Sequence, residues 1–403
     1  MAVSLEIIQK DRTSHARLGT VTTPHGTFQT PAFMTVGTKA ALKGVTAEQA
    51  RDAGAEVLLA NTYHLLLRPG SELIERRGGL HPFMCWDGPI LTDSGGYQAY
   101  SMADINAIDE DGVTFKSIIT GESIHLSPEI ATKTQNELGA DIIMAFDDCP
   151  PSVDPRTVNQ ARLRITAQSK RENKEGYDHG RRLDEALDRT ARWLERCKQA
   201  HQREETQALF GIVQGGTDLE RRTKSVEQVC NVELPGYAIG GVAVGEGTDD
   251  IARVVRHTAP LLPEQKPRYL MGVGYERDIV TAVRAGVDMF DCVLPTRNGR
   301  NANAFTANGQ IRLRNAKYAE DDRPIDPSDP DPLPYSRAYL RHLFMSKEML
   351  GPILVSLHNV RHFQRLMVDI RRAIRDDDWP AFAERWPVAA EAIGLPSASG
   401  PIV

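Results

Sequence analysis

Short runs of consecutive apolar residues recur along the chain, and each is followed by a polar or glycine-rich turn and then a helix-like segment. Continuous apolar runs are typical of strands that are buried on both faces of a parallel sheet. They lie at residues 32–37, 56–63, 90–95, 141–147, 208–216, 237–245, 268–274 and 289–295. Eight such strands with intervening helices predict an α/β fold, a (β/α)8 barrel.

Helix boundaries are marked at two places between the predicted strands. Thr46-Ala47-Glu48-Gln49 forms a capping box, and Gly54 closes the helix that it opens. Ser127-Pro128-Glu129 opens a second helix, which stops at Gly139. These signals place helices in two of the connections that a barrel requires.

Composition narrows the class of protein. The 403 residues suffice for one large barrel, and 41% hydrophobic with 25% charged residues is ordinary for a globular enzyme. No apolar run approaches the ~20 residues of a membrane span, and the first residues lack the features of a secretion signal. The five cysteines are scattered without a CxxC pair. We therefore expect a cytoplasmic protein with reduced thiols and no cysteine-rich metal site.

The distribution of charge is more informative than the net charge of −6. Between residues 297 and 317 all charged residues are basic, namely Arg297, Arg300, Arg312, Arg314 and Lys317. A basic stripe on an acidic protein suits a partner with a polyanionic backbone. Further arginines follow between residues 337 and 375, and for these a solvated helix face is the alternative interpretation.

Two predicted strands end in a carboxylate. Asp93 follows one apolar run and precedes a glycine-rich turn, and Asp291 ends another, just before Pro295 and a loop that carries positive charge only. A buried carboxylate is costly unless it is hydrogen-bonded or used. Two such carboxylates are the minimum needed to break a glycosidic bond. The alternative is that each aspartate merely caps the following turn.

In a barrel of this type the chemistry lies at the C-terminal ends of the strands. The predicted strand ends carry Asn61, Asp93, Asp147 with Asp148, Gln214, Gly240 with Gly241, Gly272 with Gly274, and Asp291. Carboxylates, amides and bare backbone can read the edges of a purine, and Tyr97 or Met271 could cover its faces. We interpret this rim as a site for a planar base.

Other motifs do not carry a function. Gly272-Val273-Gly274 lacks the third glycine of a dinucleotide-binding loop, and the sequence contains no GxxxxGK[ST] phosphate loop. His358 and His362 have the spacing of a zinc helix, but Asn359 stands where a metalloprotease needs glutamate. A nicotinamide enzyme and a metalloprotease are both disfavoured.

At this point the chain resembles the tRNA-guanine transglycosylases. The resemblance rests on five motifs, Asp93-Ser94-Gly95-Gly96-Tyr97-Gln98, Ala145-Phe146-Asp147-Asp148-Cys149, Gly211-Ile212-Val213-Gln214-Gly215-Gly216, Gly240-Gly241-Val242-Ala243-Val244-Gly245-Glu246 and Phe290-Asp291-Cys292-Val293-Leu294-Pro295-Thr296-Arg297. It implies a modified (β/α)8 TIM barrel with an inserted or C-terminal subdomain. Such enzymes exchange the wobble guanine of certain tRNAs for a 7-deazaguanine base without cutting the strand.

The resemblance also implies roles for individual residues. Asp291 matches the nucleophile that attacks the ribose C1′, and Asp93 matches the proton acceptor. The positions that match the base-binding residues are Ser94, Gly95, Gly96, Tyr97, Asp147, Cys149, Gln214, Gly240, Gly241, Val242 and Met271. Those that match tRNA-contacting loops are Gly272, Val273, Gly274, Tyr275, Glu276, Arg277, Asp278, Thr296, Arg297, Asn298, Gly299 and Arg300.

Cys149 and Val244 resemble the bacterial subtype, whose pocket takes 7-aminomethyl-7-deazaguanine (preQ1). The resemblance further implies a homodimer that binds one tRNA and contributes to queuosine synthesis. Three alternatives remain open. They are a non-catalytic RNA-binding paralogue, an archaeosine-type transglycosylase, which usually carries extra C-terminal domains, and a glycosidase acting on sugars, which the scarcity of tryptophan at the rim disfavours.

The sequence departs from the family at two places. Family members hold a structural zinc with a CxCxxC motif and a distant histidine, but residues 326–337 contain no cysteine, and His358 alone remains. Asp329 and Asp331 offer oxygens and Pro334 offers no ligand, a poor set for zinc, so we expect neither zinc nor another cofactor. Residues 156–205 are long and charged, and we expect a surface insertion without a chemical role.

These patterns divide the chain into four parts. We expect residues 1–30 to form a β segment that caps the barrel, and residues 31–300 to form the catalytic barrel. Residues 301–385 would form the C-terminal subdomain that docks RNA, equivalent to the family's zinc subdomain, and residues 386–403 would form a tail.

Overall fold

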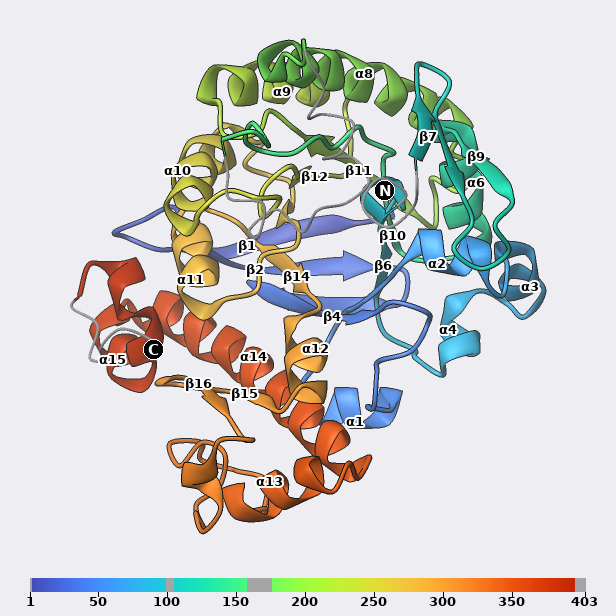
Figure 1. The fold of residues 1–403 in the computed structure, drawn as a ribbon. Coiled ribbons are helices and arrows are strands. Elements are labelled where there is room, and N and C mark those ends of the chain that lie inside the picture. Colours follow the sequence, from blue (N-terminus) through green and yellow to red (C-terminus); the bar gives the residue numbers. More distant parts are fainter. Residues whose placement is uncertain (1, 99–104, 158–175, 396–403) are drawn as a thin grey trace.

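A closed barrel of parallel strands forms the centre of the molecule (Figure 1). The computed structural model describes residues 2–98, 105–157 and 176–395. The barrel strands are β4 (Ala32–Gly37), β5 (Leu58–Ala60), β6 (Ile90–Thr92), β10 (Ile142–Met144), β11 (Ala208–Val213), β12 (Gly236–Ile239), β13 (Arg268–Leu270) and β14 (Met289–Cys292). The last strand pairs with the first, with Phe290 opposite Phe33, which closes the barrel. All eight predicted strands and the predicted barrel are confirmed.

Most strands end before the predicted boundary because the polar end of each apolar run leaves the sheet. β5 stops at Ala60, and Asn61 becomes the N-cap of α2 (Thr62–Leu67), where its side chain accepts a hydrogen bond from the His64 amide. An N-cap residue satisfies an amide that the helix leaves unpaired. The ends of the apolar runs therefore form the loops that carry the candidate site.

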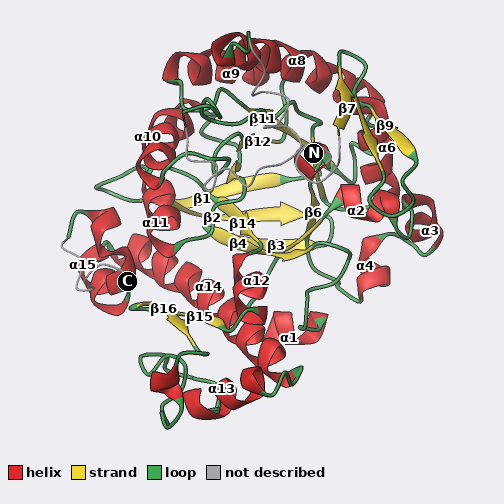
Figure 2. Ribbon diagram, in the orientation of Figure 1, coloured by secondary structure: helices red, strands yellow, loops and turns green. Residues whose placement is uncertain are grey.

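The two predicted helix starts are confirmed. Thr46 caps α1 (Ala47–Asp52) in a complete capping box with Gln49. Ser127 caps α6 (Pro128–Leu138), and Gly139 ends it in the left-handed conformation that a side chain would disfavour. The remaining helices around the barrel are α3 (Ser71–Arg76), α4 (Leu80–Met84), α8 (His179–Ala200), α9 (Leu219–Cys230), α10 (Thr248–Thr258), α11 (Glu276–Arg284) and α12 (Leu294–Arg300) (Figure 2).

The expectation of a surface insertion over residues 156–205 is wrong for α8, which is one of the helices that cover the barrel. Its apolar residues recur at helical spacing, and Leu187, Trp193 and Leu194 are buried. The Trp193 ring stacks on Phe146 with 4.9 Å between the centroids. The many charged residues lie on the outward face, so the composition of the segment concealed its apolar stripe. Residues 158–175 lie outside the described part of the chain.

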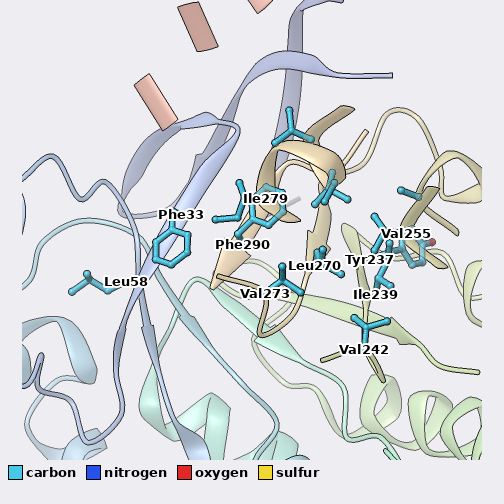
Figure 3. Packing of buried hydrophobic residues seen from close by; sticks show 14 of the residues in the cluster. Phe33, Leu58, Tyr237, Ile239, Val242, Val255, Leu270, Val273, Ile279 and Phe290 are labelled. Atoms are coloured by element: carbon cyan, nitrogen blue, oxygen red, sulfur yellow. The ribbon is translucent and has the colours of Figure 1, made fainter. Parts of the chain in front are cut away.

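Apolar side chains cover the barrel wall on both of its faces, one layer outside and one inside. Phe33, Leu58 and Phe290 belong to the large core between strands and helices, where helix residues such as Ile279 join them (Figure 3). A second cluster fills the barrel interior and includes Met34. Successive strand residues thus alternate between the helix layer and the interior, as the pleat requires. Burial on both faces explains why the apolar runs are continuous.

An antiparallel sheet of β1 (Ser4–Lys10), β2 (Arg17–Thr23) and β3 (Gly26–Thr30) closes the N-terminal end of the barrel. Apolar side chains of this sheet join the interior cluster. Arg17 forms a buried ion pair with Asp288, 2.6 Å long, just before β14. Asp141, just before β10, receives His25 at 2.8 Å and His81 at 3.1 Å. Both polar clusters lie at strand starts and leave the strand ends open to a ligand.

A second antiparallel sheet lies between β6 and α6. It consists of β7 (Ile105–Ile108), β8 (Val113–Lys116) and β9 (Ser123–Leu126). Its turn is fixed to α8, because the Trp193 indole donates to the Glu110 carbonyl over 2.8 Å.

The C-terminal part packs on the outside of the barrel around α14 (Leu350–Asp376), a helix of 27 residues. It also contains β15 (Asn303–Thr306), β16 (Gly309–Arg312), α13 (Arg337–Met345) and α15 (Trp379–Arg385). Phe363 of α14 stacks on Phe33 with 4.7 Å between the ring centroids. The Asn359 amide donates to the Pro295 carbonyl and accepts from the Phe305 amide. This helix thereby joins the subdomain to α12, which directly follows the strand that carries Asp291.

Residues 386–395, which the sequence predicts as part of a tail, are packed. Trp386 is buried and donates to Asp369 over 2.9 Å, and Ala389 in the short helix Pro387–Ile393 is fully buried. Residues 396–403 lie outside the described part. Within the described ranges, no helix combines the length and the apolar character needed to cross a membrane.

Candidate active site at the carboxyl end of the barrel

Asp93 lies directly after β6 and is buried. One of its carboxylate oxygens accepts the Thr62 amide over 2.9 Å, and the other accepts the Asn61 side-chain amide. Burial, and to a smaller extent the charge of Asp291, raise the pKa of Asp93 to about 7. An acid–base group with this pKa changes its protonation state readily near neutral pH.

Asp291 lies near the end of β14, on the same rim, close enough for its charge to act on Asp93. The Tyr269 hydroxyl donates to Oδ1 of Asp291 over 2.6 Å, and the Gly272 amide donates to the same oxygen over 2.8 Å. Burial raises the pKa of Asp291, whereas these two donors favour its ionised form. Among the described residues Oδ2 receives no hydrogen bond, so this oxygen is available for a reactant.

Sequence reasoning missed Tyr269. It lies in the middle of β13 with its side chain in the barrel interior, and burial next to Asp291 raises the pKa of its hydroxyl. The hydroxyl therefore remains a proton donor to the carboxylate at any working pH. The only signal in the sequence was an aromatic residue with a polar end inside an apolar run.

A third carboxylate, Asp147, lies beside Asp93 on the rim, because β10 pairs with β6. Asp147 follows β10, and its oxygens accept the Gln214 side-chain amide over 2.6 Å and the Ser94 hydroxyl over 3.4 Å. Burial, together with the neighbouring Asp148, raises the pKa of Asp147 to about 7. Cys149 is buried beside it, and burial raises the pKa of its thiol, which stays neutral. The three predicted motifs of Asp93, Asp147 and Gln214 thus come together.

Glycines bring the backbone close to these side chains. Gly241 has φ +60°, and a Cβ there would lie 2.2 Å from the Gln214 side-chain oxygen. A Cβ on Gly96 would lie 3.0 Å from the Asp147 carbonyl. Gly95, with φ +79°, packs against the Tyr63 backbone, and Gly240 leaves no room for a side chain next to Ile212. A flat ligand can therefore approach bare backbone at the rim.

Tyr97 and Met271 retain exposed surface for a planar ring. Tyr97 is 43% exposed, and Met271, which follows β13, is partly buried against the interior cluster. Val242 is buried beside the glycine pair. The placement of these residues suits the roles that the resemblance implies.

Two of the strand-end residues face elsewhere than the sequence indicates. Asp148 points to α8, where Arg182 and Arg189 bind its carboxylate at 2.6 and 2.5 Å. Asn61 holds Asp93 and caps α2, so its side chain is already engaged. Asp148 turns away because adjacent residues of an extended chain point to opposite sides, and α8 supplies the cations that its burial requires.

The predicted tRNA-contacting segments divide by burial. Gly272 and Tyr275 are exposed, and Arg277 is partly exposed. Val273, Gly274 and Asp278 are buried, as is Glu276, which bonds to His362 over 2.7 Å. Glu276 thereby links α11 to α14, and the buried side chains are not available to an RNA surface.

The expectation of a loop after Pro295 is wrong, because residues 294–300 form the helix α12. Proline fits the first turn of a helix, where its missing amide is not needed. Thr296 and Gly299 pack inward, and a Cβ on Gly299 would lie 2.6 Å from Ser356 of α14. Arg297, Asn298 and Arg300 remain partly exposed on the outer face.

The residues at the expected zinc position do not fit that metal. His358 of α14 is buried, and its Nε2 is 2.8 Å from the Phe305 carbonyl, to which it donates. Burial lowers the pKa of His358 to about 4, so the ring is neutral. The nearby carboxylates Asp326 and Asp329 are bound to Arg365. The set offers no thiolate, its one imidazole is hydrogen-bonded to a carbonyl, and its two carboxylates are paired with an arginine, so it cannot supply the four nitrogen or sulfur ligands of a structural zinc site.

Comparison with known proteins supplies independent findings. The family model described as queuine tRNA-ribosyltransferase matches residues 11–182 and 172–391. A queuine tRNA-ribosyltransferase of Halalkalibacterium halodurans is 46% identical over 387 residues, which is 96% of either chain. Its counterpart in Acetivibrio thermocellus is 48% identical over 93% of this chain and 95% of its own. The Staphylococcus aureus protein of the same name is 45% identical over 96% of both chains.

Proposed function

Because this chain belongs to the queuine tRNA-ribosyltransferase family, we propose that it is a tRNA-guanine transglycosylase. It exchanges the wobble guanine of tRNA for preQ1 in the bacterial route to queuosine. The observation that carries this proposal is the pair Asp93 and Asp291 on one rim, with one oxygen of Asp291 held by Tyr269 and Gly272 and the other open.

In the first half of the reaction, Oδ2 of Asp291 attacks the ribose C1′ of the tRNA. The C1′–N9 bond breaks, its electron pair leaves with guanine, and the tRNA stays attached as an ester of Asp291. The cationic character of the transition state favours an ionised Asp291, which the donors on Oδ1 support. Asp93, with a pKa of about 7, is suited to protonate the departing base.

In the second half, the incoming 7-deazaguanine gives its ring N9 proton to Asp93 and attacks C1′ on the face that guanine left. The ester bond to Asp291 breaks, and its electron pair returns to the carboxylate. Two displacements at C1′ give net retention of configuration, as in the glycosidases that use two carboxylates. Asp93 thus returns to the protonation state from which it began.

The base is recognised by the part of the rim that carries Asp147, Gln214 and Gly241. The carboxylate of Asp147 accepts hydrogen bonds from the donor edge of guanine, and Gln214 and the backbone at Gly241 address its carbonyl oxygen. Tyr97 and Met271 cover the two faces of the ring. Cys149 and Val244 match the bacterial subtype, whose pocket takes the aminomethyl group of preQ1.

The tRNA backbone is bound by the outer face of α12 and the loop before α11. Arg297 and Arg300 supply positive charge, and Gly272, whose amide bonds to Asp291, and Tyr275 are exposed. Phosphate contacts of this kind position a nucleic acid without reading its sequence. The protein acts on tRNA in the cytoplasm as a homodimer.

The test is incorporation of radiolabelled guanine into unmodified tRNA by the purified protein. We expect incorporation with the native chain, and loss of at least 10³-fold in Asp291→Ala because the nucleophile is gone. Asp87→Ala, which removes a carboxylate that is 86% exposed, is the matched control and leaves the rate unchanged. Exchange that persists in Asp291→Ala, or is absent from the native protein, overturns the proposal, and the second result would favour a non-catalytic RNA-binding role.

A further inference from the structure

Arg222 of α9 is a fully buried cation beneath the base-binding rim, and its guanidinium bonds to backbone carbonyls instead of a carboxylate. Its donors reach the carbonyls of Gly216 at 2.8 Å, Val213 at 3.2 Å, Gly240 at 2.7 Å and Gly241 at 2.8 Å. Burial lowers its pKa to about 10, so it is still charged at neutral pH. Among the described residues Arg222 forms no ion pair, although the charge of Glu246 favours its ionised form, and a buried cation held mainly by carbonyls is expensive, which indicates a specific role.

The geometry of the peptide bond defines that role. In a trans peptide the carbonyl of one residue and the amide N–H of the next lie in one plane and point in opposite directions. Arg222 holds the carbonyls of Gly240 and Gly241. The N–H groups of Gly241 and Val242 must therefore point away from Arg222.

The peptides that Arg222 holds lie next to the residues proposed to bind the base. A Cβ on Gly241 would nearly touch the side-chain oxygen of Gln214, whose amide bonds to Asp147. Arg222 also holds Val213 and Gly216 on either side of Gln214. One guanidinium thus holds the two loops that carry the base-binding groups. By binding their carbonyls, it determines whether the backbone presents N–H or C=O groups on the opposite side.

We propose that Arg222 is a positioning residue that orients the amides of Gly241 and Val242 as donors toward the base and so selects a purine with a carbonyl at C6. The inference rests on the proposed function. Without Arg222 the two peptides are free to rotate, and a carbonyl in place of an N–H would accept from a 6-amino group. Loss of Arg222 therefore weakens the binding of guanine and relaxes discrimination against 2,6-diaminopurine, which carries that amino group.

The experiment compares Arg222→Met and Arg222→Lys with the adjacent Arg221→Met. Arg221 lies on the same turn but pairs with Asp184 and Asp218 at the surface, so it controls for loss of a cation on α9. Each variant is assayed for guanine exchange into tRNA, with separate KM values for guanine and tRNA, and for inhibition by 2,6-diaminopurine. Thermal unfolding establishes that each variant is folded.

We expect Arg222→Met to raise the KM for guanine about 10- to 100-fold, the loss of one or two hydrogen bonds, with a smaller change in kcat and in the KM for tRNA. Inhibition by 2,6-diaminopurine should strengthen in the same variant. Arg222→Lys, whose ammonium cannot reach four carbonyls at once, should show an intermediate KM, and it serves if the Met variant does not fold. An unchanged KM for guanine in a folded variant, or equal losses in Arg221→Met, overturns the inference. Failure of the native enzyme to exchange guanine would instead overturn the proposed function.

A different observation, in the C-terminal subdomain, carries a second inference. Arg365 of α14 forms ion pairs with Asp326 at 3.0 Å and with Asp329 at 2.7 Å, and its guanidinium lies over the Trp386 ring. Asp326 is buried and also accepts the Ala307 amide over 3.0 Å. Although burial opposes ionisation, hydrogen bonds from Ser328 and these partners hold the pKa of Asp326 below its usual range.

This ion-pair cluster has its carboxylates in the segment, residues 326–337, that corresponds in sequence to the zinc motif of the resembled family and lacks that motif's cysteines. It connects the loop at residues 326–331 with α14 and with the β15–β16 turn at Ala307. We infer that the Arg365 cluster replaces zinc in this chain, so that the subdomain folds without a metal.

The test measures zinc in the purified protein and thermal unfolding with and without a strong chelator. We expect far less than one zinc per chain, no effect of the chelator, and a lower Tm in Arg365→Met. Arg361→Met is the matched control, because its partner Asp331 is 88% exposed and such pairs contribute little. One zinc per chain, a Tm that falls with the chelator, or equal Tm values for both arginine variants would overturn the inference.

Discussion

The hydrogen bond from Tyr269 to Asp291 allows a test in which the nucleophile itself is left in place. Replacing Tyr269 by Phe removes the 2.6 Å hydrogen bond to Oδ1 and leaves the Gly272 amide as the remaining donor. The ring stays in the barrel interior, so packing changes little. Only the balance between the ionised and protonated forms of Asp291 is altered.

The expected magnitude follows from the chemistry of that bond. A hydrogen bond to a charged group contributes about 1.5–3 kcal/mol, and one pKa unit corresponds to about 1.36 kcal/mol. Loss of a donor that favours the carboxylate should therefore raise the pKa of Asp291. Because only the ionised form attacks C1′, the rate below this pKa falls by about 10- to 100-fold, and the rate above it recovers.

The assay is kcat/KM for tRNA in guanine exchange, measured across the pH range in which the protein stays folded. We expect the acidic limb of the profile to move to higher pH in Tyr269→Phe, with alkaline rates close to those of the native enzyme. Tyr237→Phe is the control, since its buried hydroxyl bonds to the Val232 carbonyl and not to the site. An unmoved limb, or a loss of equal size at every pH, would refute the assignment of Tyr269.

Three further outcomes are expected. The pKa of Asp93 rises from 3.8 to about 7 on folding, so its ionisation destabilises the folded state as the pH increases from about 4 to 7. Asp93→Asn should therefore raise the free energy of unfolding at pH 8 by roughly 4 kcal/mol. Denaturant titrations should show that this gain disappears toward pH 4. Gly241→Ala places a methyl group 2.2 Å from a pocket amide oxygen, and its KM for guanine should increase tenfold or more while tRNA binding, measured separately, is unchanged. Arg182→Gln removes a partner from the buried Asp148 and should lower stability by about 1–3 kcal/mol, against less than about 1 kcal/mol for the exposed Arg192→Gln; equal unfolding midpoints would contradict this.

The sequence alone determined the features that depend on neighbouring residues. The eight apolar runs predicted the barrel because a strand buried on both faces must be apolar at every position. Thr46 and Ser127 marked helix starts because a cap acts within one turn of the chain. Asp93 and Asp291 were identifiable as candidates because a carboxylate at the end of an apolar run is costly to bury unless it is hydrogen-bonded or functional.

The local pattern was misleading where two local signals competed. Pro295 predicts the start of a loop, yet proline is equally suited to the first turn of α12. The charged segment before Glu205 was interpreted as an insertion, yet α8 buries a stripe that includes Trp193. In both segments the decision came from contacts with α14 or the barrel strands, which are distant in sequence.

Only the tertiary structure decided which groups support the candidate site. Tyr269 reaches Asp291 across 22 positions of the chain, and Arg222 reaches Gly241 across 19. Arg365 meets Asp326 across 39. No local pattern specifies such a contact, because it exists only once the barrel has closed and brought strand ends and helices to one place. The sequence therefore indicates which residues can react. The closed barrel determines which partners set the ionisation and the orientation of their side chains.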